Sequence, residues 1–559
     1  MKIFKSPQEK PWIFVLFCLS TRLIWCFPLD NRFVIGSDFS SHFFKIWYIS
    51  RYGVTNWNYF WYGGYPFLYY YSPFSYLLAG EMGKLLTPIL AFKLISDFTF
   101  LLAVPLFYIF LKELNVRKQV RLVSTLLFSI TPVYPYYLLK GAYPTYFNLP
   151  FLLLGSTLLL KYLRHKKNIF LLSSGLVFSL SLLSHYFSFA IFSSMLLVFL
   201  FFFRKEYVPG LFIALVLSCS LSIFWLLPFI LGIKYSSSHF AVSLPSLISF
   251  EHFLLPQKYV YIFLLFGCMV SVFLLKEILS VKSSRPYVFT TLIFGVVALF
   301  SPYKRFLFLL PIFGNVAVSY SIISTNKLSK LFLSVIAFVF LILSLSLRPS
   351  YYEVSQTSIS FLPYLREGRS ICFTDEIDIC HFQSVYFPQQ NREVIAGAFP
   401  QSQSKAKRSY LVNLFNPTKI NQTEYLALLK AGFITNIIIN KNLSKHVNYF
   451  RSFGSFEKIY EDERFIIFSP KDRFSYLELN GKNIISKVEK RKDEIYIHTL
   501  CNESGTLLIK ESFHPGWRIY LNGRMVKAKE NKFGFILINA KRGSCIIKMV
   551  FDKYWFFGI

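Results

Sequence analysis

Apolar stretches close to 20 residues long recur along the first 348 residues of the chain. A helix needs about 20 such residues to cross the roughly 30 Å hydrocarbon core of a bilayer. Only 16% of all residues are charged, which excludes an ordinary soluble protein. Eleven spans are predicted, at 11–29, 96–111, 122–138, 147–163, 169–184, 186–203, 208–232, 259–275, 287–302, 306–325 and 331–347.

The positions of the basic residues orient these spans. The net charge is +31, and Lys and Arg gather at the N-terminus and in five short loops. Short basic loops remain in the cytoplasm, and these share one side only if the aromatic run 68–90 does not cross the membrane. We therefore predict that 68–90 is re-entrant or lies on the surface. The basic charge then reflects membrane topology, and no nucleic acid partner is expected.

With the N-terminus inside and eleven spans, everything after Arg348 lies outside the plasma membrane. Residues 1–348 form a transmembrane domain whose first outer loop is 30–95. In 349–470, short apolar runs alternate with a helical pattern, which predicts an α/β module. In 471–559, short alternating strands separated by turns such as Asn522-Gly523 predict a β-sandwich. The fold class is a polytopic α-helical membrane protein with this extracytoplasmic α/β plus β-sandwich domain.

Five acidic residues fall on or near the outer face, where an acid close to a membrane is a functional candidate by default. Capping or pairing with Arg32 is the favoured interpretation of Asp30, whereas for Asp97 a local ion pair with Lys93 and a chemical role both stay open. Asp38 follows Gly36-Ser37, where a helix can start, and His42 then stands one turn away on the same face. Such a pair can share a proton, hold a metal or cap a surface helix. The five acids are Asp30, Asp38, Glu81, Asp97 and Glu251.

An aromatic segment, NWNYFWYGGYPFLYYYSPFSYLLAG, occupies 56–80. Aromatic belts are common at membrane surfaces, which is the plain interpretation. The flat rings of Trp and Tyr also stack on sugars and flank lipid chains. Composition alone leaves both interpretations open.

These residues together resemble a known superfamily. Gly36-Ser37-Asp38 with His42, the Trp61-Tyr62-Gly63-Gly64-Tyr65-Pro66 turn and Tyr71-Ser72-Pro73-Phe74 resemble the first outer loop of the GT-C integral-membrane glycosyltransferases. The closest match is the 6-pyruvoyl-tetrahydropterin-synthase-related membrane-domain family, although nothing indicates pterin chemistry. The resemblance extends loosely through Gly141-Ala142-Tyr143-Pro144, Leu183-Ser184-His185 and Pro302-Tyr303-Lys304-Arg305-Phe306, over most of 11–325.

The resemblance implies a transferase that moves a sugar from a polyprenyl-phosphate-linked donor to a glycan, lipid or protein acceptor on the outer face. It implies that Asp38 is the general base. Lys304 and Arg305 then supply the cation for the departing phosphate, although basic residues at a membrane end also serve as anchors. His185 and His252 are substrate or phosphate ligands, with a structural role as the alternative. The substrate-binding candidates are His42, Trp61, Tyr143, His185, Glu251, His252, Lys304 and Arg305.

The sequence departs from the superfamily at one point. Many members carry a second acid in the next outer loop, whereas 140–148 here has none. Glu251, with His252, is a substitute from a later loop, so a requirement for a divalent metal stays open.

Two other functions compete with catalysis. A non-catalytic glycan-binding or assembly protein keeps the aromatic outer surface and does not need Asp38. A lipid-linked-glycan transporter needs polar residues at mid-bilayer depth along several spans, and the sequence has few. Four cysteines fall outside, where an oxidising compartment allows pairing, namely Cys372, Cys380, Cys501 and Cys545.

Overall fold

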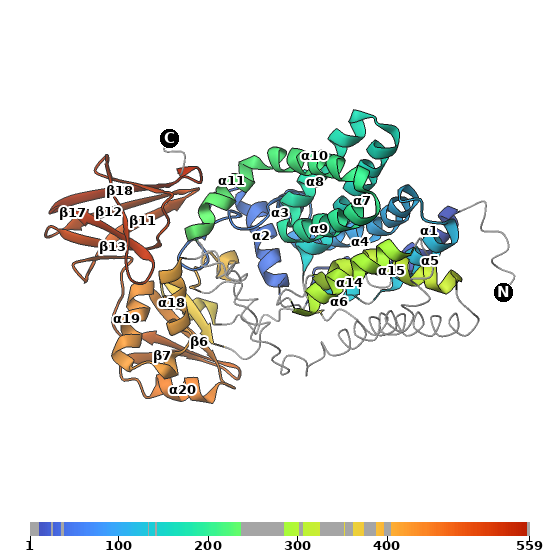
Figure 1. Ribbon diagram of the computed structural model, residues 1–559. Coiled ribbons are helices and arrows are strands. Elements are labelled where there is room, and N and C mark those ends of the chain that lie inside the picture. The colour runs from blue at the N-terminus through green and yellow to red at the C-terminus, as the bar shows by residue number, and fades with distance from the viewer. Residues whose placement is uncertain are drawn as a thin grey trace. The chain divides into compact units, whose positions relative to one another are not determined.

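The computed structural model describes residues 11–23, 26–34, 38–131, 133–139, 142–235, 284–300, 306–324, 351–352, 361–373, 387–395 and 404–555. The chain divides into two compact units (Figure 1). The helical unit comprises 1–35, 72–224 and 242–351. The mixed unit comprises 36–71, 225–241 and 352–559, so part of the predicted first outer loop clusters with the C-terminal residues.

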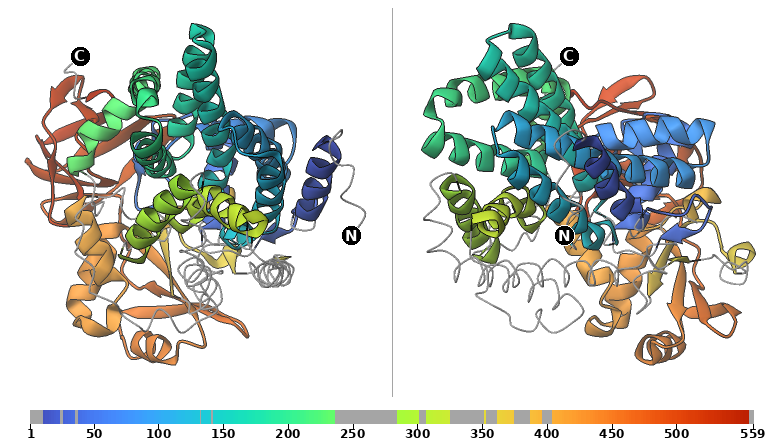
Figure 2. Two further views of the ribbon diagram at one scale, coloured as in Figure 1. Left: turned by 45° about the vertical axis from the view of Figure 1, so that its right-hand side comes forward. Right: turned by 90° about the vertical axis from the view of Figure 1, so that its right-hand side faces the viewer.

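The helical unit is built from apolar helices joined by short connections. Within it, α7 packs against both α4 and α8, and α10 packs against α8 (Figure 2). Small residues allow α7 and α8 to approach closely. Ser174 of α8 donates to the carbonyl oxygen of Gly155 in α7 at 2.8 Å. The elements are α1 (Pro11–Leu23), β1 (Phe33–Val34), α3 (Phe74–Leu85), α4 (Pro88–Glu113), α5 (Lys118–Ile130), α6 (Val133–Leu139), α7 (Tyr143–His165), α8 (Asn168–Ser184), α9 (Tyr186–Phe203), η1 (Lys205–Tyr207), α10 (Val208–Leu221), α14 (Arg285–Phe300) and α15 (Phe306–Ser324).

Among the described helices, α4 and α7 are each long and apolar enough to cross a membrane. Helices α10 and α11 (Ile223–Gly232) pass that test together but are bent by 80° at a short break. The predicted single span 208–232 is therefore interrupted at Ser222. The predicted span 122–138 is likewise two helices, α5, which has Thr131 as its C-cap, and α6, which begins at Val133.

Helix starts also differ from the prediction. α4 begins at Pro88, eight residues before the predicted start at 96, with Thr87 as its N-cap accepting from Leu90 N at 3.3 Å. The 68–90 run contains α3, which has 12 residues and is about 18 Å long at 1.5 Å per residue. That length is short of a bilayer core and agrees with a segment that does not cross. The predicted spans 259–275 and 331–347 lie outside the described residues.

A buried arginine connects several helices of the helical unit. Arg22 of α1 is fully buried and donates to the carbonyl oxygens of Phe100 and Phe128, each at 2.8 Å. Its guanidinium also lies over the rings of Phe100, Phe128 and Tyr134 at 4.2, 4.7 and 5.0 Å. Carbonyl dipoles and ring faces thus surround the charge and join α1 to α4, α5 and α6. The sequence did not single out this residue.

The mixed unit contains a four-stranded sheet in the order β5-β6-β8-β7. β5 and β6 are parallel, and the remaining pairs are antiparallel. Helices α18, α19 and α20 belong to the same region of the chain (Figure 1). The elements are α2 (Phe39–Tyr52), β2 (Trp57–Asn58), β3 (Tyr65–Pro66), η2 (Ile233–Tyr235), β4 (Tyr351–Tyr352), η5 (Leu362–Tyr364), β5 (Arg369–Phe373), α18 (Lys405–Leu414), η7 (Pro417–Lys419), α19 (Gln422–Gly432), β6 (Ile434–Asn440), α20 (Ser444–Arg451), β7 (Phe456–Glu461) and β8 (Phe465–Pro470).

The last part of the chain forms two five-stranded sheets, β10-β9-β13-β17-β16 and β11-β12-β18-β14-β15. Inward side chains of both sheets, such as Ile497 and Ile509, form one buried cluster, as in a sandwich. Asn522 and Gly523 have φ of 50° and 78° and turn β14 into β15, as the sequence predicts. The strands are β9 (Leu477–Leu479), β10 (Lys482–Ile484), β11 (Ser486–Arg491), β12 (Glu494–Cys501), β13 (Gly505–Ser512), β14 (Trp517–Leu521), β15 (Arg524–Val526), β16 (Lys529–Glu530), β17 (Phe535–Ala540) and β18 (Gly543–Phe551).

Candidate functional site

The candidate site lies at the N-terminal end of α2, where Asp38 is the N-cap residue. The carbonyl oxygen of Asp38 accepts from His42 N at 3.2 Å and from Ser41 Oγ at 2.7 Å, which starts the helix. The Asp38 side chain is exposed and makes no capping hydrogen bond. The main chain of Asp38 therefore starts the helix, while its carboxylate is accessible to solvent.

Three ionisable side chains share one face of α2. Asp38, His42 and Lys45 are spaced by four and then three residues, which places them in a row along a helix. His42 and Lys45 are each 2% exposed, whereas Asp38 is exposed. The row thus runs from solvent at Asp38 into the interior at Lys45.

Aromatic rings enclose the inner part of this row. The Lys45 ammonium lies 5.4 Å from the Tyr71 ring centre and 5.7 Å from that of Trp61, and it donates to Ser41 O at 3.3 Å. The His42 and Tyr71 ring centres are 5.9 Å apart. Burial lowers the pKa of Lys45 well below its ordinary value, and the nearby Asp38 charge opposes this shift. A carboxylate and a lysine with linked protonation therefore occupy one helix face.

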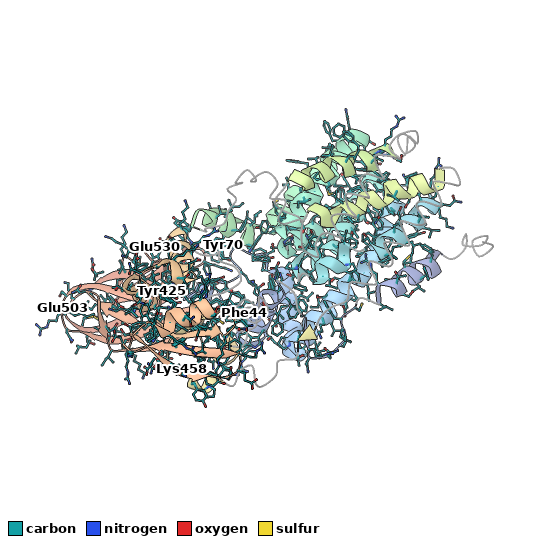
Figure 3. The ribbon with its side chains drawn as sticks, turned by 90° about the horizontal axis from the view of Figure 1, so that it is seen from below. Phe44, Tyr70, Tyr425, Lys458, Glu503 and Glu530 are labelled. Carbon is teal, nitrogen blue, oxygen red and sulfur yellow. The ribbon has the colours of Figure 1, made fainter. Side chains whose placement is uncertain are left out.

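Trp61 forms a wall of this enclosure. It is fully buried, and its ring stacks on Phe44 (labelled in Figure 3) at 4.0 Å and on Tyr65 at 5.9 Å. A ring covered in this way holds Lys45 and α2 in place. The geometry favours a positioning role for Trp61 over the predicted contact with a substrate.

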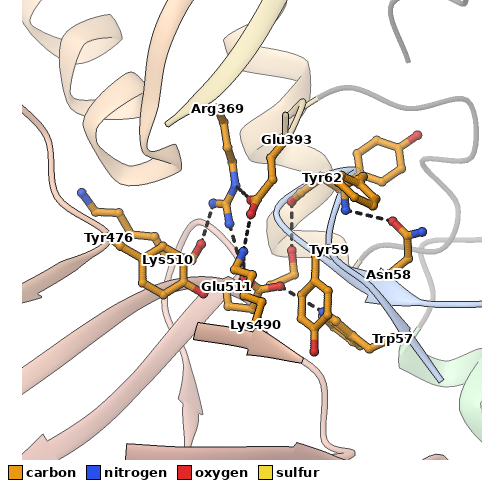
Figure 4. Close-up of polar contacts among 12 residues, drawn as sticks. Trp57, Asn58, Tyr59, Tyr62, Arg369, Glu393, Tyr476, Lys490, Lys510 and Glu511 are labelled. Carbon is orange, nitrogen blue, oxygen red and sulfur yellow. Dashed lines mark hydrogen bonds and ion pairs between the residues drawn. The ribbon is translucent and has the colours of Figure 1, made fainter. Parts of the chain in front are cut away.

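Hydrogen bonds anchor the loop after α2, which contains β2, to the sandwich. Trp57 belongs to the sandwich core, and its Nε1 donates to Glu511 at 3.0 Å (Figure 4). Asp493 accepts from the main-chain nitrogens of Asn56 and Trp57 at 2.6 and 2.8 Å. Ser512 N donates to the carbonyl oxygen of Gly63 at 2.7 Å. The segment that follows the candidate site is thus fixed at several points.

A charged network lies beneath this anchor (Figure 4). The fully buried Arg369 pairs with Glu393 at 2.9 Å and with Glu511 at 3.3 Å. Lys490 pairs with the same two carboxylates, and Tyr476 donates to Glu511 at 2.7 Å. Burial alone would lower the pKa of Arg369, but Glu393 and Glu511 raise it above the ordinary value. Burial would raise the pKa of Glu393, but Lys490 and Arg369 lower it. Two basic side chains, Arg369 and Lys490, thus face two acidic ones, Glu393 and Glu511.

The turn Tyr62-Gly63-Gly64 needs its glycines. All three residues have positive φ, of 62°, 73° and 95°. A Cβ on Gly64 would lie 2.0 Å from Glu511 Oε1 and 2.5 Å from Trp57 Nε1. Gly64 thus allows the loop to approach the network, which gives a physical reason for the Gly-Gly pair noted in the sequence.

A buried histidine joins the loop to the sandwich. His514 Nδ1 accepts from Gly516 N at 3.0 Å, so the other ring nitrogen carries the proton, and it lies 3.4 Å from the Tyr70 hydroxyl. Tyr70 donates in turn to the carbonyl oxygen of Gly232 at 3.1 Å. Burial lowers the pKa of His514 to about 3, so the ring is neutral. No local sequence pattern predicts this contact.

The other outer acids are engaged in contacts within the helical unit. Asp30 pairs with Lys93 at 2.6 Å and with Arg32 at 2.7 Å. Glu81 pairs with Lys84 at 2.6 Å, and Asp97 accepts from Phe27 N at 2.9 Å. Asp38 stays the base predicted from the sequence, and Glu251 lies outside the described residues.

Two predicted substrate ligands have structural contacts in the helical unit. His185 is the N-cap of α9, where its Nδ1 accepts from Ser188 N at 3.2 Å. The Tyr143 hydroxyl donates to the carbonyl oxygen of Ser75 at 3.0 Å. His252, Lys304 and Arg305 lie outside the described residues. Within the described ranges, no three His, Cys, Asp or Glu side chains gather as a metal site would require.

No protein-family model matches the chain, and no curated protein does. Several solved structures are similar. The archaeal oligosaccharyltransferase AglB from Archaeoglobus fulgidus, in complex with an inhibitory peptide and a dolichol-phosphate, has a TM-score of 0.52 and 12% identity, covering 78% of this chain and 70% of AglB. The arabinofuranosyltransferase AftD from Mycobacteria has a TM-score of 0.56 and 9% identity, covering 96% of this chain and 57% of AftD. ArnT from Cupriavidus metallidurans has a TM-score of 0.50 and 11% identity, covering 82% of this chain and 98% of ArnT.

These structures define the class of fold. The chain shares its overall fold with these structures, in a helical part and a C-terminal β-rich part. At 9–12% identity the likeness concerns the fold, so activity and substrates are matters for proposal.

Proposed function

We propose that this chain is a GT-C glycosyltransferase with Asp38 as its general base. It moves a sugar from a polyprenyl-phosphate-linked donor to an acceptor on the outer face of the membrane. The observation that carries the proposal is the exposed carboxylate of Asp38, which shares one face of α2 with the buried Lys45. The loop that follows α2 is anchored to the sandwich. The same proposal includes the eleven spans and the extracytoplasmic α/β and sandwich modules. It also includes membership of the 6-pyruvoyl-tetrahydropterin-synthase-related membrane-domain family.

In the proposed reaction, an acceptor hydroxyl attacks the anomeric carbon of the donor sugar. The bond from that carbon to the phosphate oxygen breaks, and polyprenyl phosphate leaves with the bonding electrons. Asp38 takes the hydroxyl proton as the new bond forms. His42 and Lys45 hold the start of α2 in place and balance the charge of Asp38. They are therefore positioning residues.

The donor assignment draws on the likeness to AglB, whose structure holds a dolichol-phosphate. The phosphate of such a donor needs a cation as it departs, and Lys304 and Arg305 are the residues proposed from the sequence. The acceptor is a glycan, lipid or protein. Membrane lipids surround the helical unit in this proposal.

Asp38→Asn tests the base directly. Asn keeps the size and polarity of the side chain but takes no proton, so transfer of a labelled sugar should fall by roughly 100-fold or more. Because the Asp38 side chain makes no capping bond, thermal stability should change little. Glu503→Gln, the same carboxylate-to-amide change in an exposed turn (Figure 3), is the control and should keep full transfer. Near-normal transfer by Asp38→Asn would contradict the proposal.

A cavity in the mixed unit favours a second candidate, a non-catalytic glycan-binding protein. It has a volume of about 1080 Å³ and is lined by Arg392, Asn483, Phe474 and Tyr476 among others. Aromatic rings beside planar polar side chains suit sugar rings and hydroxyls. Under this alternative, Phe474→Ala weakens retention of the chain on immobilised cell-envelope glycan, and Asp38→Asn changes nothing.

A further inference from the structure

Two cysteines of the sandwich face each other across neighbouring strands. Cys501 ends β12 and Cys545 lies in β18, with Cys501 opposite Gly543 and Thr499 opposite Cys545. Residues two apart on a strand share a face, so the two cysteines are diagonal neighbours on the same side of the sheet. Both are 1–2% exposed and belong to the sandwich core.

Their sulfur atoms are nearly within bonding distance. Sγ of Cys545 lies 2.9 Å from Sγ of Cys501, and both are thiols in this structure. A disulfide needs about 2.05 Å, so a movement of less than 1 Å by two side chains would join them. In the reduced state this contact is a hydrogen bond from the Cys545 thiol to Cys501 Sγ.

We propose that Cys501 and Cys545 are joined by a disulfide in the mature protein. The proposal rests on the outward placement of the C-terminal region and is independent of the catalytic role of Asp38. In an oxidising compartment, a thiolate of one cysteine attacks a disulfide of an exported thiol oxidant and forms a mixed disulfide. The second cysteine displaces the oxidant, which leaves as a dithiol. Two thiols of this chain are thereby oxidised, and one disulfide of the oxidant is reduced.

Oxidation belongs to the folding step. In the closed core, burial raises the pKa of Cys501 to about 12, which suppresses the thiolate needed for exchange. The bond therefore forms before the two sheets close. Once formed, it is shielded from reductants by the same core.

The disulfide would fix the strand to which the candidate loop is anchored. β12 begins directly after Asp493, which accepts from Asn56 and Trp57 at the other end of that strand. A crosslink at Cys501 ties β12 to β18 and closes a loop of about 44 residues in the unfolded chain. Its effect is to stabilise the platform beneath the first outer loop.

The test uses the full chain, purified from membranes without reductant. Denaturation in N-ethylmaleimide followed by peptide mass analysis should show a crosslinked pair of peptides containing Cys501 and Cys545, both free of the reagent. When dithiothreitol is present during denaturation, both should be alkylated. When it is present during heating, it reduces the unfolded chain, so the melting temperature should fall by about 5 °C or more. In Cys501→Ser, Cys545 should be alkylated without reductant.

The double variant Cys501→Ala/Cys545→Ala is the matched control, because its melting temperature should not respond to dithiothreitol. The variant Lys458→Cys reports the side of the membrane through an impermeant maleimide on intact cells. Complete alkylation of both native cysteines without reductant, with Lys458→Cys labelled from outside, would overturn the disulfide alone. The same alkylation with Lys458→Cys shielded would overturn the disulfide together with the predicted topology. The first result does not bear on Asp38, whereas the second also overturns the outer placement of Asp38.

Discussion

The indole nitrogen of Trp57 donates a 3.0 Å hydrogen bond to the buried carboxylate of Glu511, although 454 residues separate the two in the sequence. Glu511 also pairs with Arg369 and Lys490 and accepts from Tyr476. The loop that follows the candidate base is therefore tied to a network built from the far end of the chain. Under the proposed function, the C-terminal region therefore acts on the site by positioning this loop and not by direct chemistry.

The Gly64 position tests this link. Gly64→Ala would place a Cβ 2.0 Å from Glu511 Oε1, at a φ of 95°. The loop or the carboxylate must move, so we expect a loss of about 3 kcal/mol or more in the free energy of unfolding of the mixed unit. Sugar transfer should fall with it. Denaturant titration and a transfer assay measure the two effects.

Gly523→Ala is the control for backbone strain. Its φ is 78°, and no atom lies within 4 Å of the point that a Cβ would occupy. Strain alone should cost about 1–2 kcal/mol and leave transfer unchanged. Equal effects of the two substitutions on transfer would contradict the anchoring role of Gly64.

A second prediction concerns the dependence of stability on pH. His514 has a pKa of about 3 in the folded protein, against an ordinary value of 6.5. The unfolded chain thus binds a proton at pH values where the folded chain does not. The contribution of His514 to stability is complete above about pH 6.5 and is lost as the pH falls from there towards 3.

Melting temperatures measured from pH 8 to pH 4 check this prediction. His514→Gln should lower stability at pH 8 and flatten the decline below pH 6.5. His498→Gln, on the exposed side of β12, should leave the profile as it is. A decline of unchanged steepness in His514→Gln would assign the acid sensitivity to other groups.

The third prediction concerns topology. Gln119 lies beside the basic loop before α5, and Lys458 lies in the four-stranded sheet (labelled in Figure 3). The positive-inside rule places Gln119 in the cytoplasm and Lys458 outside. In intact cells an impermeant maleimide should label Lys458→Cys and not Gln119→Cys, with the parent chain as background. The reverse pattern would invalidate the orientation and the outer placement of Asp38.

Local patterns were sufficient for part of this structure. The apolar stretches located most of the described helices, and Asn522-Gly523 located the β14–β15 hairpin, because both signals act over a few neighbouring residues. The breaks at Ser222 and at Thr131 were missed, since mean hydropathy does not register a change in helix direction. Asp38 and His42 were found as a pair at helical spacing.

Long-range contacts were beyond the reach of sequence patterns. Lys45 continues the helix face of Asp38 and His42, so its spacing was a usable signal, but its burial depends on Trp61 and Tyr71 from further along the chain. Because lysine side chains are exposed in most proteins, nothing in the sequence indicated that Lys45 is buried. The partnership of Trp57 with Glu511 has no local signal, because nothing near either residue specifies the other.

The fourth prediction separates the role of Lys45 in function from its role in folding. Lys45→Met keeps the length of the side chain and removes a buried amine whose pKa burial lowers well below the ordinary value. Taking an ionisable group out of an apolar enclosure should leave the melting temperature equal or higher. If Lys45 sets the charge balance around Asp38, sugar transfer should nevertheless fall by about 10-fold or more, and its pH profile should shift.

Lys45→Arg completes the comparison, because it keeps a charge but makes it permanent and bulkier. We expect it to lower stability, since the enclosure formed by Trp61 and Tyr71 must open to admit a guanidinium. Lys45→Met should thus lose activity without losing stability, whereas Lys45→Arg should lose stability. Full transfer with an unchanged pH profile in Lys45→Met would show that Lys45 only fills space, and Asp38 would then act without its help.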